Sequence, residues 1–430
     1  MKKRGFYRLP ERGKPLRCVR MTLVLLALPA AGVVHAADDS ALRLSGFGTL
    51  GYVRDNRPDM APARDISQSP GDSSRTGPGW QVDSRVGVQL EYTLGPFVDF
   101  VGQVILRDQF KADLNSATDL AYVALKPGAG VDLRIGRINY DAFLMSDYRN
   151  VGYAYQWIRP PAEFYGWIPI FSLDGVDLAY TLRDDDVRWR FKAQAGNSQL
   201  KIPIDSGYDF RAKNMLGASL SRQSGVWRLK AAYSQFRSPN EVPAFSALHQ
   251  GLDQVIAANL PRISAEAADL RSNVAFKDAR MTYATLGAAY DDGVWVGQAE
   301  VGRTTATAAV IPHGRMAYAS IGRRIGQWTP SLTLSASRPG NDLRSAANNW
   351  GAYNGLLRDP AIQTINTTRI AQETVSLGVR WDFYSNAALK LQWERTLVKP
   401  SGYGLWWRDM VINEQTSRIN QLSASMDFTF

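Results

Sequence analysis

Hydrophobic and polar residues alternate with a period of two along most of this chain. Over residues 80–94, apolar side chains take nearly every even position and polar side chains take most odd positions. Residues 187–195 and 375–383 repeat the same alternation. A helix would space its apolar residues three or four positions apart, so the pattern predicts β-strands with one apolar and one polar face.

The alternation and the intervening turn residues predict sixteen strands. They lie at about 42–54, 80–94, 97–110, 117–126, 131–139, 174–182, 187–196, 213–222, 226–236, 279–290, 294–304, 314–325, 329–338, 372–384, 387–398 and 417–430.

Short and long connections alternate between these strands. Gly95-Pro96 and Ser385-Asn386 are short turns, whereas 55–79, 140–173 and 339–371 are long. Inside a bilayer every backbone N–H and C=O must be paired, which an open sheet cannot achieve. Short turns at one rim and long loops at the other therefore predict an all-β fold, a transmembrane antiparallel β-barrel with both chain ends at the short-turn rim.

The first 36 residues have the pattern of a secretory signal peptide. Eight basic residues and one acidic residue precede an apolar run at 21–34, and Val34-His35-Ala36 offers small residues for cleavage. We expect 1–36 to be removed during export through the periplasm and 37–430 to form a single outer-membrane barrel domain.

Removal of that segment changes the charge of the protein. The whole chain has 50 basic and 40 acidic residues, and the segment takes away 8 and 1, which leaves 42 and 39. The remaining net charge of +3 gives no reason to expect a nucleic-acid partner. The only cysteine, Cys18, is lost as well, so no thiolate chemistry or cysteine metal site is expected.

The chain ends on a strand of the same alternating kind. Leu422, Ala424, Met426, Phe428 and Phe430 share one face, with polar residues between them. A final aromatic residue in phase with the apolar face resembles the terminal strand of outer-membrane proteins. That resemblance implies recognition of Phe428 and Phe430 by the barrel-assembly machinery; an edge strand of a soluble sheet is the alternative interpretation.

Three further segments resemble the Gram-negative porin superfamily: LSGFGTLGYVR at 44–54, VDSRVGVQLEY at 82–92, and RIGRINYDAFLMSDYRNVGYAYQWIRPPAEFYG at 134–166. The resemblance implies a sixteen-stranded general porin, a homotrimer in outer-membrane lipid and lipopolysaccharide. It also implies an inward-folded third loop that narrows a water-filled channel for passive diffusion of ions and small hydrophilic solutes, with no cofactor. Residues 161–166 are similar to a short motif of that loop, although Ala162 and Tyr165 depart from it.

The third loop, 140–173, contains many large apolar residues, which a fully solvated loop does not need. We therefore expect it to pack against the inner wall, as long structured loops are usually functional. Asp141, Asp147 and Glu163 are candidates to project acid into the constriction.

Basic side chains face the lumen by the parity of the strands, and they are the candidates for the pore wall. They are Arg85, Arg107, Arg134, Arg188, Arg190, Lys192, Arg228 and Lys230. Acid on the loop and base on the wall would create a transverse field that orients solutes and selects ions. Ion pairs among these charges are the alternative, and we predict a weak anion preference.

Other patterns in the chain carry less chemistry. Residues 46–51 match a dinucleotide-binding glycine pattern but lack the strand, helix and acidic residue that such a site requires. His249 and His313 lie in loops, so neither a catalytic residue nor a metal site is expected. Residues 238–278 contain helix-forming sequence. The alternatives to a passive channel are a surface receptor or adhesin and a barrel-type hydrolase.

Overall fold

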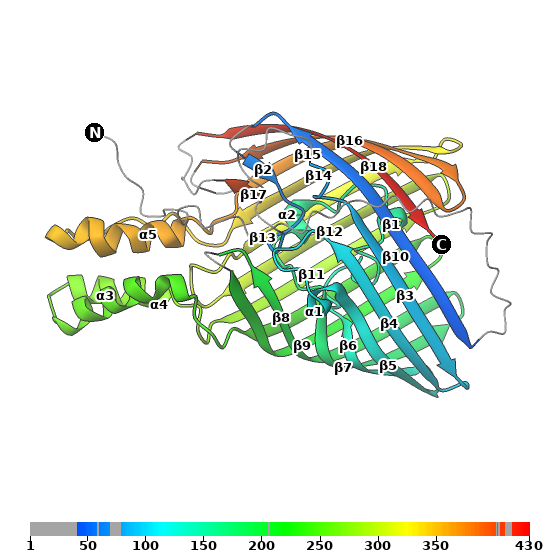
Figure 1. Cartoon of the computed structure of the whole chain (residues 1–430), viewed down its shortest axis with the longest axis horizontal. Helices are drawn as coiled ribbons and strands as arrows, with labels where there is room; N and C mark the ends of the chain where they lie inside the picture. Colours follow the sequence, from blue (N-terminus) through cyan, green and yellow to red (C-terminus); the bar gives the residue numbers. More distant parts are fainter. Residues whose placement is uncertain are drawn as a thin grey trace. The chain divides into compact units, whose positions relative to one another are not determined.

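The strands close into a single antiparallel barrel in which β1 pairs with both β18 and β3 (Figure 1). The computed structural model describes residues 41–57, 60–68, 79–204, 207–400, 402, 405–408 and 415–430. Residues Ala41–Phe430 form one compact unit. The expected signal peptide, 1–36, lies outside the described residues.

All sixteen predicted strands are present in the barrel. They are β1 (Leu42–Asp55), β3 (Arg85–Leu94), β4 (Val98–Arg107), β5 (Thr118–Gly128), β6 (Val131–Asn139), β7 (Ser172–Asp184), β8 (Val187–Ile202), β9 (Tyr208–Ser224), β10 (Trp227–Arg237), β11 (Arg280–Asp291), β12 (Trp295–Ala306), β13 (Gly314–Arg323), β14 (Trp328–Pro339), β15 (Gln372–Tyr384), β16 (Ala387–Val398) and β18 (Ser417–Thr429). β2 (Met60–Pro62) and β17 (Trp406–Arg408) form a separate two-stranded sheet.

Away from the loop ends of β9–β13, the apolar side chains of the strands face outward. Leu90 of β3 and Leu391 of β16 expose 46% and 56% of their surface, while the neighbouring Gln392 is buried. In water such exposure would be costly, whereas a hydrocarbon environment satisfies it. Glycine serves the short turns, as at Gly225 and Gly293, where φ is 53° and 88°.

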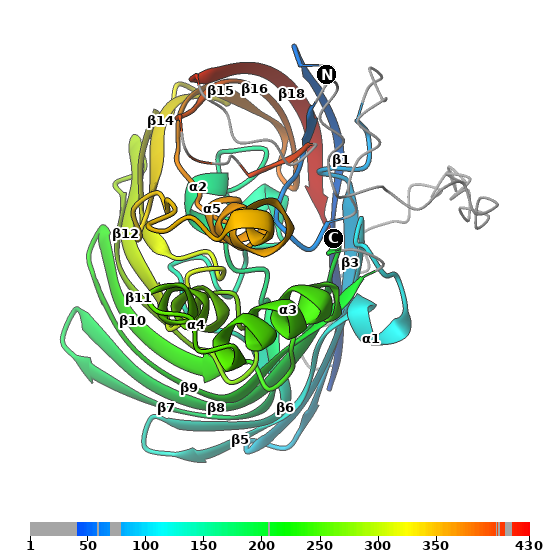
Figure 2. The same cartoon turned by 90° about the vertical axis from the view of Figure 1, so that its left-hand side faces the viewer.

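The helices lie in the loops. They are α1 (Leu114–Ala117), α2 (Ala162–Tyr165), α3 (Ser246–Ala257), α4 (Ile263–Asn273) and α5 (Asp359–Asn366), with short 3-10 or π turns at Gly152–Ala154, Pro243–Phe245, Gly351–Tyr353 and Asn354–Arg358. α3 and α4 confirm the helices predicted in the fifth loop, and with α5 they extend beyond the loop end of the barrel (Figures 1 and 2). None of the helices in the described part of the chain has the length and apolar character needed to cross a bilayer.

Glycines shape the seam at which β1 and β18 close the barrel. On the outer face of the closing seam, the rings of Phe428 and Phe430 cover Gly48 and Gly46, where any larger residue would collide with them. Backbone hydrogen bonds of 2.8 and 3.0 Å join Gly46 and Phe430 in both directions. The glycine pattern at 46–51 therefore lies within strand β1, at the seam of the barrel.

Candidate functional site: the third loop and the inner wall

The third loop, residues 140–171, joins β6 to β7 and contacts inward-facing side chains of most of the barrel strands. Its core is aromatic: Phe143 packs against Tyr165 and Tyr283 at ring-centroid distances of 5.0 and 5.2 Å, and Phe164 packs against Tyr318 at 5.2 Å. All five rings are buried. Packing of this kind contributes beyond the buried area itself and fixes the path of the loop.

Arg159 anchors the loop to the seam side of the barrel through buried charges. Its guanidinium donates to both carboxylate oxygens of Asp83, at 3.0 and 2.6 Å, and to Ser423 at 2.9 Å. It also pairs with Glu394 of β16 at 2.5 Å. Burial would lower the pKa of Arg159, but the carboxylates of Asp83 and Glu394 raise it above its usual value. The group therefore stays charged and holds four chain segments together.

Lys390 of β16 provides a second anchor. Its ammonium donates to the carbonyls of Gly152 and Trp157 at 2.7 and 2.8 Å and pairs with Asp427 of β18 at 3.0 Å. The indole of Trp157 donates to Thr333 of β14 at 2.7 Å. Backbone groups of an irregular loop are thus satisfied by wall side chains, as buried peptide groups require.

Two carboxylates accept hydrogen bonds where the loop meets β12–β15. Glu300 accepts from the Leu144 amide at 2.9 Å and from Tyr318 at 2.6 Å, and Tyr165 also donates to it. Glu163, the predicted constriction acid, is only 2% exposed and accepts from Ser335 at 2.6 Å.

Gln372 and Thr374 of β15 also donate to Glu163. Its carboxylate fixes α2 to the wall and does not face the predicted arginines across a gap.

Asp141, another predicted constriction acid, lies between two lysines of the predicted wall. Lys230 pairs with one carboxylate oxygen and Lys192 lies 3.3 Å from the other, while Ser219 donates at 2.6 Å. Burial would raise the pKa of Asp141, but Lys230 and Lys192 lower it below its usual value. Asp147 accepts a hydrogen bond from Asn139.

On the opposite wall, two predicted arginines converge on one loop residue. Arg85 donates to the Asn150 carbonyl at 2.6 Å, and Arg107 donates to the Asn150 side chain at 2.7 Å. The Arg107 guanidinium also lies 3.7 Å from the centre of the Phe171 ring. The loop therefore contacts both sides of the barrel.

The remaining predicted wall residues differ in how open they are. Arg134 is paired with Asp177 through its Nε at 3.0 Å, and Arg190 pairs with Asp132 at 3.0 Å. Arg228 donates to the Tyr148 hydroxyl at 2.5 Å. Arg188 is exposed near the short-turn rim. All eight lie on the inward-facing positions expected from strand parity.

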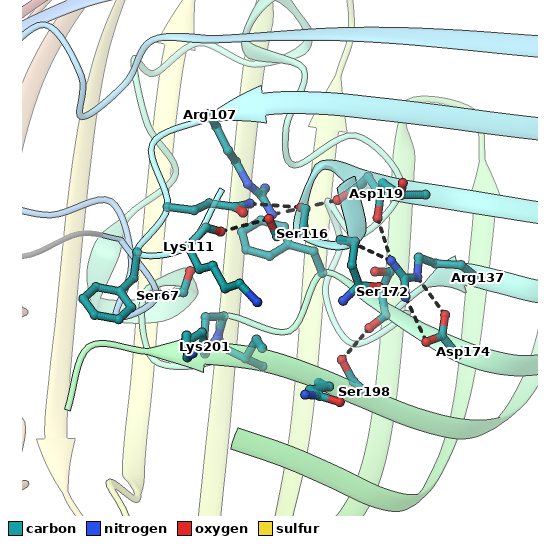
Figure 3. Close-up of a pocket in the computed structure, with 18 residues that line it drawn as sticks. Ser67, Arg107, Lys111, Ser116, Asp119, Arg137, Ser172, Asp174, Ser198 and Lys201 are labelled. Atoms are coloured by element: carbon teal, nitrogen blue, oxygen red, sulfur yellow. Dashed lines mark hydrogen bonds and ion pairs between the residues drawn. The ribbon is translucent and has the colours of Figure 1, made fainter. Parts of the chain in front are cut away.

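A small polar pocket of about 80 Å³ opens beside this junction (Figure 3). Arg107, Asp119, Phe171 and Lys201 are among the residues that line it. It has room for a few water molecules. Arg137, at its edge, pairs with Asp174 at 2.7 Å.

Sequence reasoning missed Arg159 as an anchor, because an arginine in a loop has no strand parity to place it. The sequence could have predicted Lys390 and Glu300 as anchors, because each is a charged residue at an inward-facing position of a strand. Neither predicted loop histidine forms a catalytic cluster: His249 is buried, and His313 contacts the carbonyl of Ile311 at 2.8 Å. Among the described residues, no group of three or more His, Cys, Asp or Glu side chains is placed to hold a metal ion.

Comparisons with known proteins agree with this architecture. The model of the Gram-negative porin family matches residues 22–354. A search of curated proteins by sequence finds no match.

Among solved structures, OmpF of Salmonella typhi in complex with daunomycin aligns with 90% of this chain and 97% of its own, at 14% identity and a TM-score of 0.53. The outer membrane channel DcaP of Acinetobacter baumannii aligns over 90% and 97%, at 10% identity and a TM-score of 0.47. At 14% identity, the likeness to OmpF shows a shared fold and no shared ligand. With the family match covering most of the chain, the closed barrel and its polar inner wall identify the protein as a member of the Gram-negative porin family, a channel of the bacterial outer membrane.

Proposed function

We propose that this protein is a passive diffusion channel for ions and small hydrophilic solutes, and that its third loop lies in the lumen and narrows it. The observation that carries the proposal is the set of contacts from residues 140–171 to opposite walls. Asn150 binds Arg85 and Arg107 on β3 and β4, and Asp141 pairs with Lys230 on β10. A loop held at both ends in this way divides the barrel interior and leaves the charged wall residues around the remaining path.

Several assignments belong to this proposal. The third loop forms the constriction, with Asp141 and Asp147 on it and with Glu163 holding it against the wall, and the wall includes the eight basic residues named above. Residues 1–36 direct export through the periplasm, the barrel-assembly machinery recognises Phe428 and Phe430, and the protein needs no cofactor and catalyses no reaction. The assembled form is a homotrimer, as the resemblance to the general porins implies.

Recording from the purified protein in planar bilayers tests the channel. We expect stable steps of current in salt, and swelling of proteoliposomes in small sugars that falls off as the sugar grows. A barrel that inserts but passes neither ions nor sugars would overturn the proposal. Cross-linking in mild detergent tests the trimer, and a product no larger than a monomer would contradict it.

A surface receptor or adhesin is the second candidate, and the helices at the loop end favour it. α3 and α4 pack on each other, and Glu266 of α4 accepts hydrogen bonds from the Ala347 and Asn348 amides at 2.8 and 3.1 Å. This joins the fifth and seventh loops into one exposed platform. Deletion of α3 and α4 would abolish binding to cells if the platform were the functional part, and would leave conductance intact.

A further inference from the structure

The outer wall over β7–β14 contains an apolar groove of about 1070 Å³, which we call the outer groove. Small side chains form its floor, among them Ala218 and Ala284, and larger ones such as Tyr180, Tyr233 and Leu286 border it. All of these lie on outward-facing positions of their strands. A barrel wall covered evenly by large residues would have no such hollow.

One end of the outer groove is lined by arginines. Arg303 of β12 is directly opposite Arg315 of β13, and Arg315 is directly opposite Arg338 of β14. These three residues, which we call the arginine row, face outward and are exposed. Like charges placed opposite each other across strands repel and destabilise the sheet unless a counter-ion sits between them.

The protein neutralises this charge only in part. Glu373 pairs with Arg338, but it also pairs with Lys399 at 2.7 Å. Within the described part of the chain, no carboxylate contacts Arg303 or Arg315. Three arginines and a lysine thus share one carboxylate, so the row retains a strong attraction for an anion.

Strand register fixes the row relative to the groove. Tyr233 pairs with Ala218 on one side and with Ala284 on the other, and Ala284 pairs with Arg303. The apolar floor and the arginine row are therefore consecutive positions of one cross-strand line. Arg315 and Arg338 lie at the loop ends of their strands, where the barrel leaves the hydrocarbon.

We propose that the outer groove and the arginine row bind a phosphorylated lipid with several acyl chains from the outer leaflet. The acyl chains lie over the alanines, and a phosphate is held by the guanidinium groups of Arg303 and Arg315. Arginine suits this role because its planar fork donates two hydrogen bonds to one phosphate. The proposal rests on the outer-membrane location that belongs to the family and deepens the proposed function.

A second copy of this chain fits the site less well. Outward-facing carboxylates near the loop rim of the described strands are Asp174, Asp209 and Glu373, and each is already paired with a base. A neighbouring subunit would offer little to neutralise the row. The loop ends of β3 and β4 present Val86, Val104 and Leu106 instead, an apolar face without this excess of charge.

The test measures binding of bis-phosphorylated lipid A to the delipidated full barrel by native mass spectrometry. We expect one tightly held lipid per chain. Replacing both free arginines, in R303Q/R315Q, should weaken binding about thirtyfold, since each basic group near an anionic lipid surface contributes on the order of 1 kcal/mol. Ala284→Trp keeps every charge but fills the groove, and should also weaken binding.

The matched control is R222Q/R323Q. These two arginines also face outward, but they lie over Trp189 and Trp295 at 5.6 and 5.4 Å near the short-turn rim. The control should bind lipid as the unmodified protein does.

Equal loss in the control, or no loss in R303Q/R315Q, would overturn the proposal. Displacement of the lipid by millimolar inorganic phosphate would also overturn it, because the site would then be a simple anion site. A fall in the trimer fraction of Ala284→Trp would show that the groove is a subunit interface and overturn it too. Bilayer conductance of the same samples tests the channel separately, so a conducting protein that binds no lipid refutes only this site.

Discussion

The two halves of the wall over β9–β13 have opposite polarity. Near the short turns, inward-facing side chains are polar, such as Ser221 and Lys230, and outward-facing ones are apolar, such as Leu229. Near the loops, Tyr283 and Met316 point inward and are buried, while Arg315 and its equivalents point outward. The inward-facing positions therefore meet the open lumen at the turn end and the packed third loop at the loop end.

A β-bulge produces the switch on β9. The register between β9 and β10 shifts at this point, and Asn214 has a left-handed φ of 52°. Phe210 on one side of the bulge and Leu216 on the other are both at even positions, yet Phe210 points inward and Leu216 outward. One extra residue therefore exchanges the faces while the sequence alternation continues.

The largest effect is expected from a deletion at the seam between β1 and β18, at the turn end of the barrel. Deletion of Phe430 removes two backbone hydrogen bonds to Gly46 and the ring that covers it. We expect barrel closure to fail, with outer-membrane levels of the protein reduced about tenfold or more, because β18 pairs with β1 to close the barrel. Immunoblots of outer-membrane fractions measure this. Phe430→Tyr is the control, and normal levels of the deleted form would contradict the role of the terminal aromatic.

At the loop end, the stability of the barrel and the position of the third loop should depend most on Arg159. Arg159→Ala leaves Asp83 and Glu394 as buried unpaired acids, which costs about 3–5 kcal/mol of stability. The third loop should then lose its seam contact, and single-channel current should become larger and noisier. Thermal unfolding and bilayer recording provide the two measurements.

Arg188→Gln, at the turn end, is the substitution whose effect on stability is compared with that of Arg159→Ala. Arg188 is exposed and has no buried partner to abandon, so its replacement should change stability by less than about 0.5 kcal/mol. Equal destabilisation by the two substitutions would mean that the loop end is not the packed half of the barrel.

The sequence predicted the turn-end half much better than the loop-end half. Arg188, Arg190 and Lys230 lie on strands at the positions for which parity predicts an inward face, because each position of a regular strand alternates in face. It began the eighth strand at 213, whereas the structure begins β9 at Tyr208, beyond the bulge that interrupts parity. A bulge depends on the register with neighbouring strands, which the local pattern does not encode.

The third loop shows the same limit in its side chains. Its aromatic content indicated that it packs, but the partner of each charge depends on contacts between residues hundreds of positions apart. Glu163 bonds with Ser335 and Gln372 for this reason, although its charge suggested a place in open water. Arg159 gave no signal at all, since its partners Asp83 and Glu394 are distant in the chain.

Charge-reversing substitutions in either half of the barrel should change ion selectivity, with smaller effects than the changes described above. Replacing Arg107 and Arg134 with glutamate should shift the predicted weak anion preference towards cations. We expect a roughly twofold change in permeability ratio, because low-dielectric walls focus the field of nearby charges. The R188E/R190E variant should act in the same direction but more weakly, since exposed charges are better screened by salt. Reversal potentials in a salt gradient measure both.

Thermal unfolding serves as the control for folding in each variant. An unchanged reversal potential in the folded R107E/R134E protein would show that these arginines do not line the ion path. A larger shift from R188E/R190E would place the narrowest part of that path in the turn-end half instead.

The smallest expected effect concerns the platform above the loop end, and it depends on pH. Burial would raise the pKa of Glu266, but hydrogen bonds from the Ala347 amide, Trp350 and Asn348 lower it below 4.5. A carboxylate whose pKa falls on folding adds stability above its unfolded pKa, and the gain is lost as pH drops through the folded value. Protection of the Ala347 and Asn348 amides should thus stay constant from neutral pH to about pH 5 and fall in more acidic solution.

Hydrogen exchange, corrected for the intrinsic pH dependence, measures that protection. Glu266→Gln keeps one acceptor oxygen but loses the charge, so protection at neutral pH should fall about tenfold, the loss expected for weakened hydrogen bonds to a charged group. Asp253→Asn is the matched control, because its exposed ion pair with Arg271 at 3.1 Å contributes little. Protection that is equally low in the Asp253 variant, or that persists in Glu266→Gln, would mean that α4 is held to the seventh loop by its apolar contacts alone.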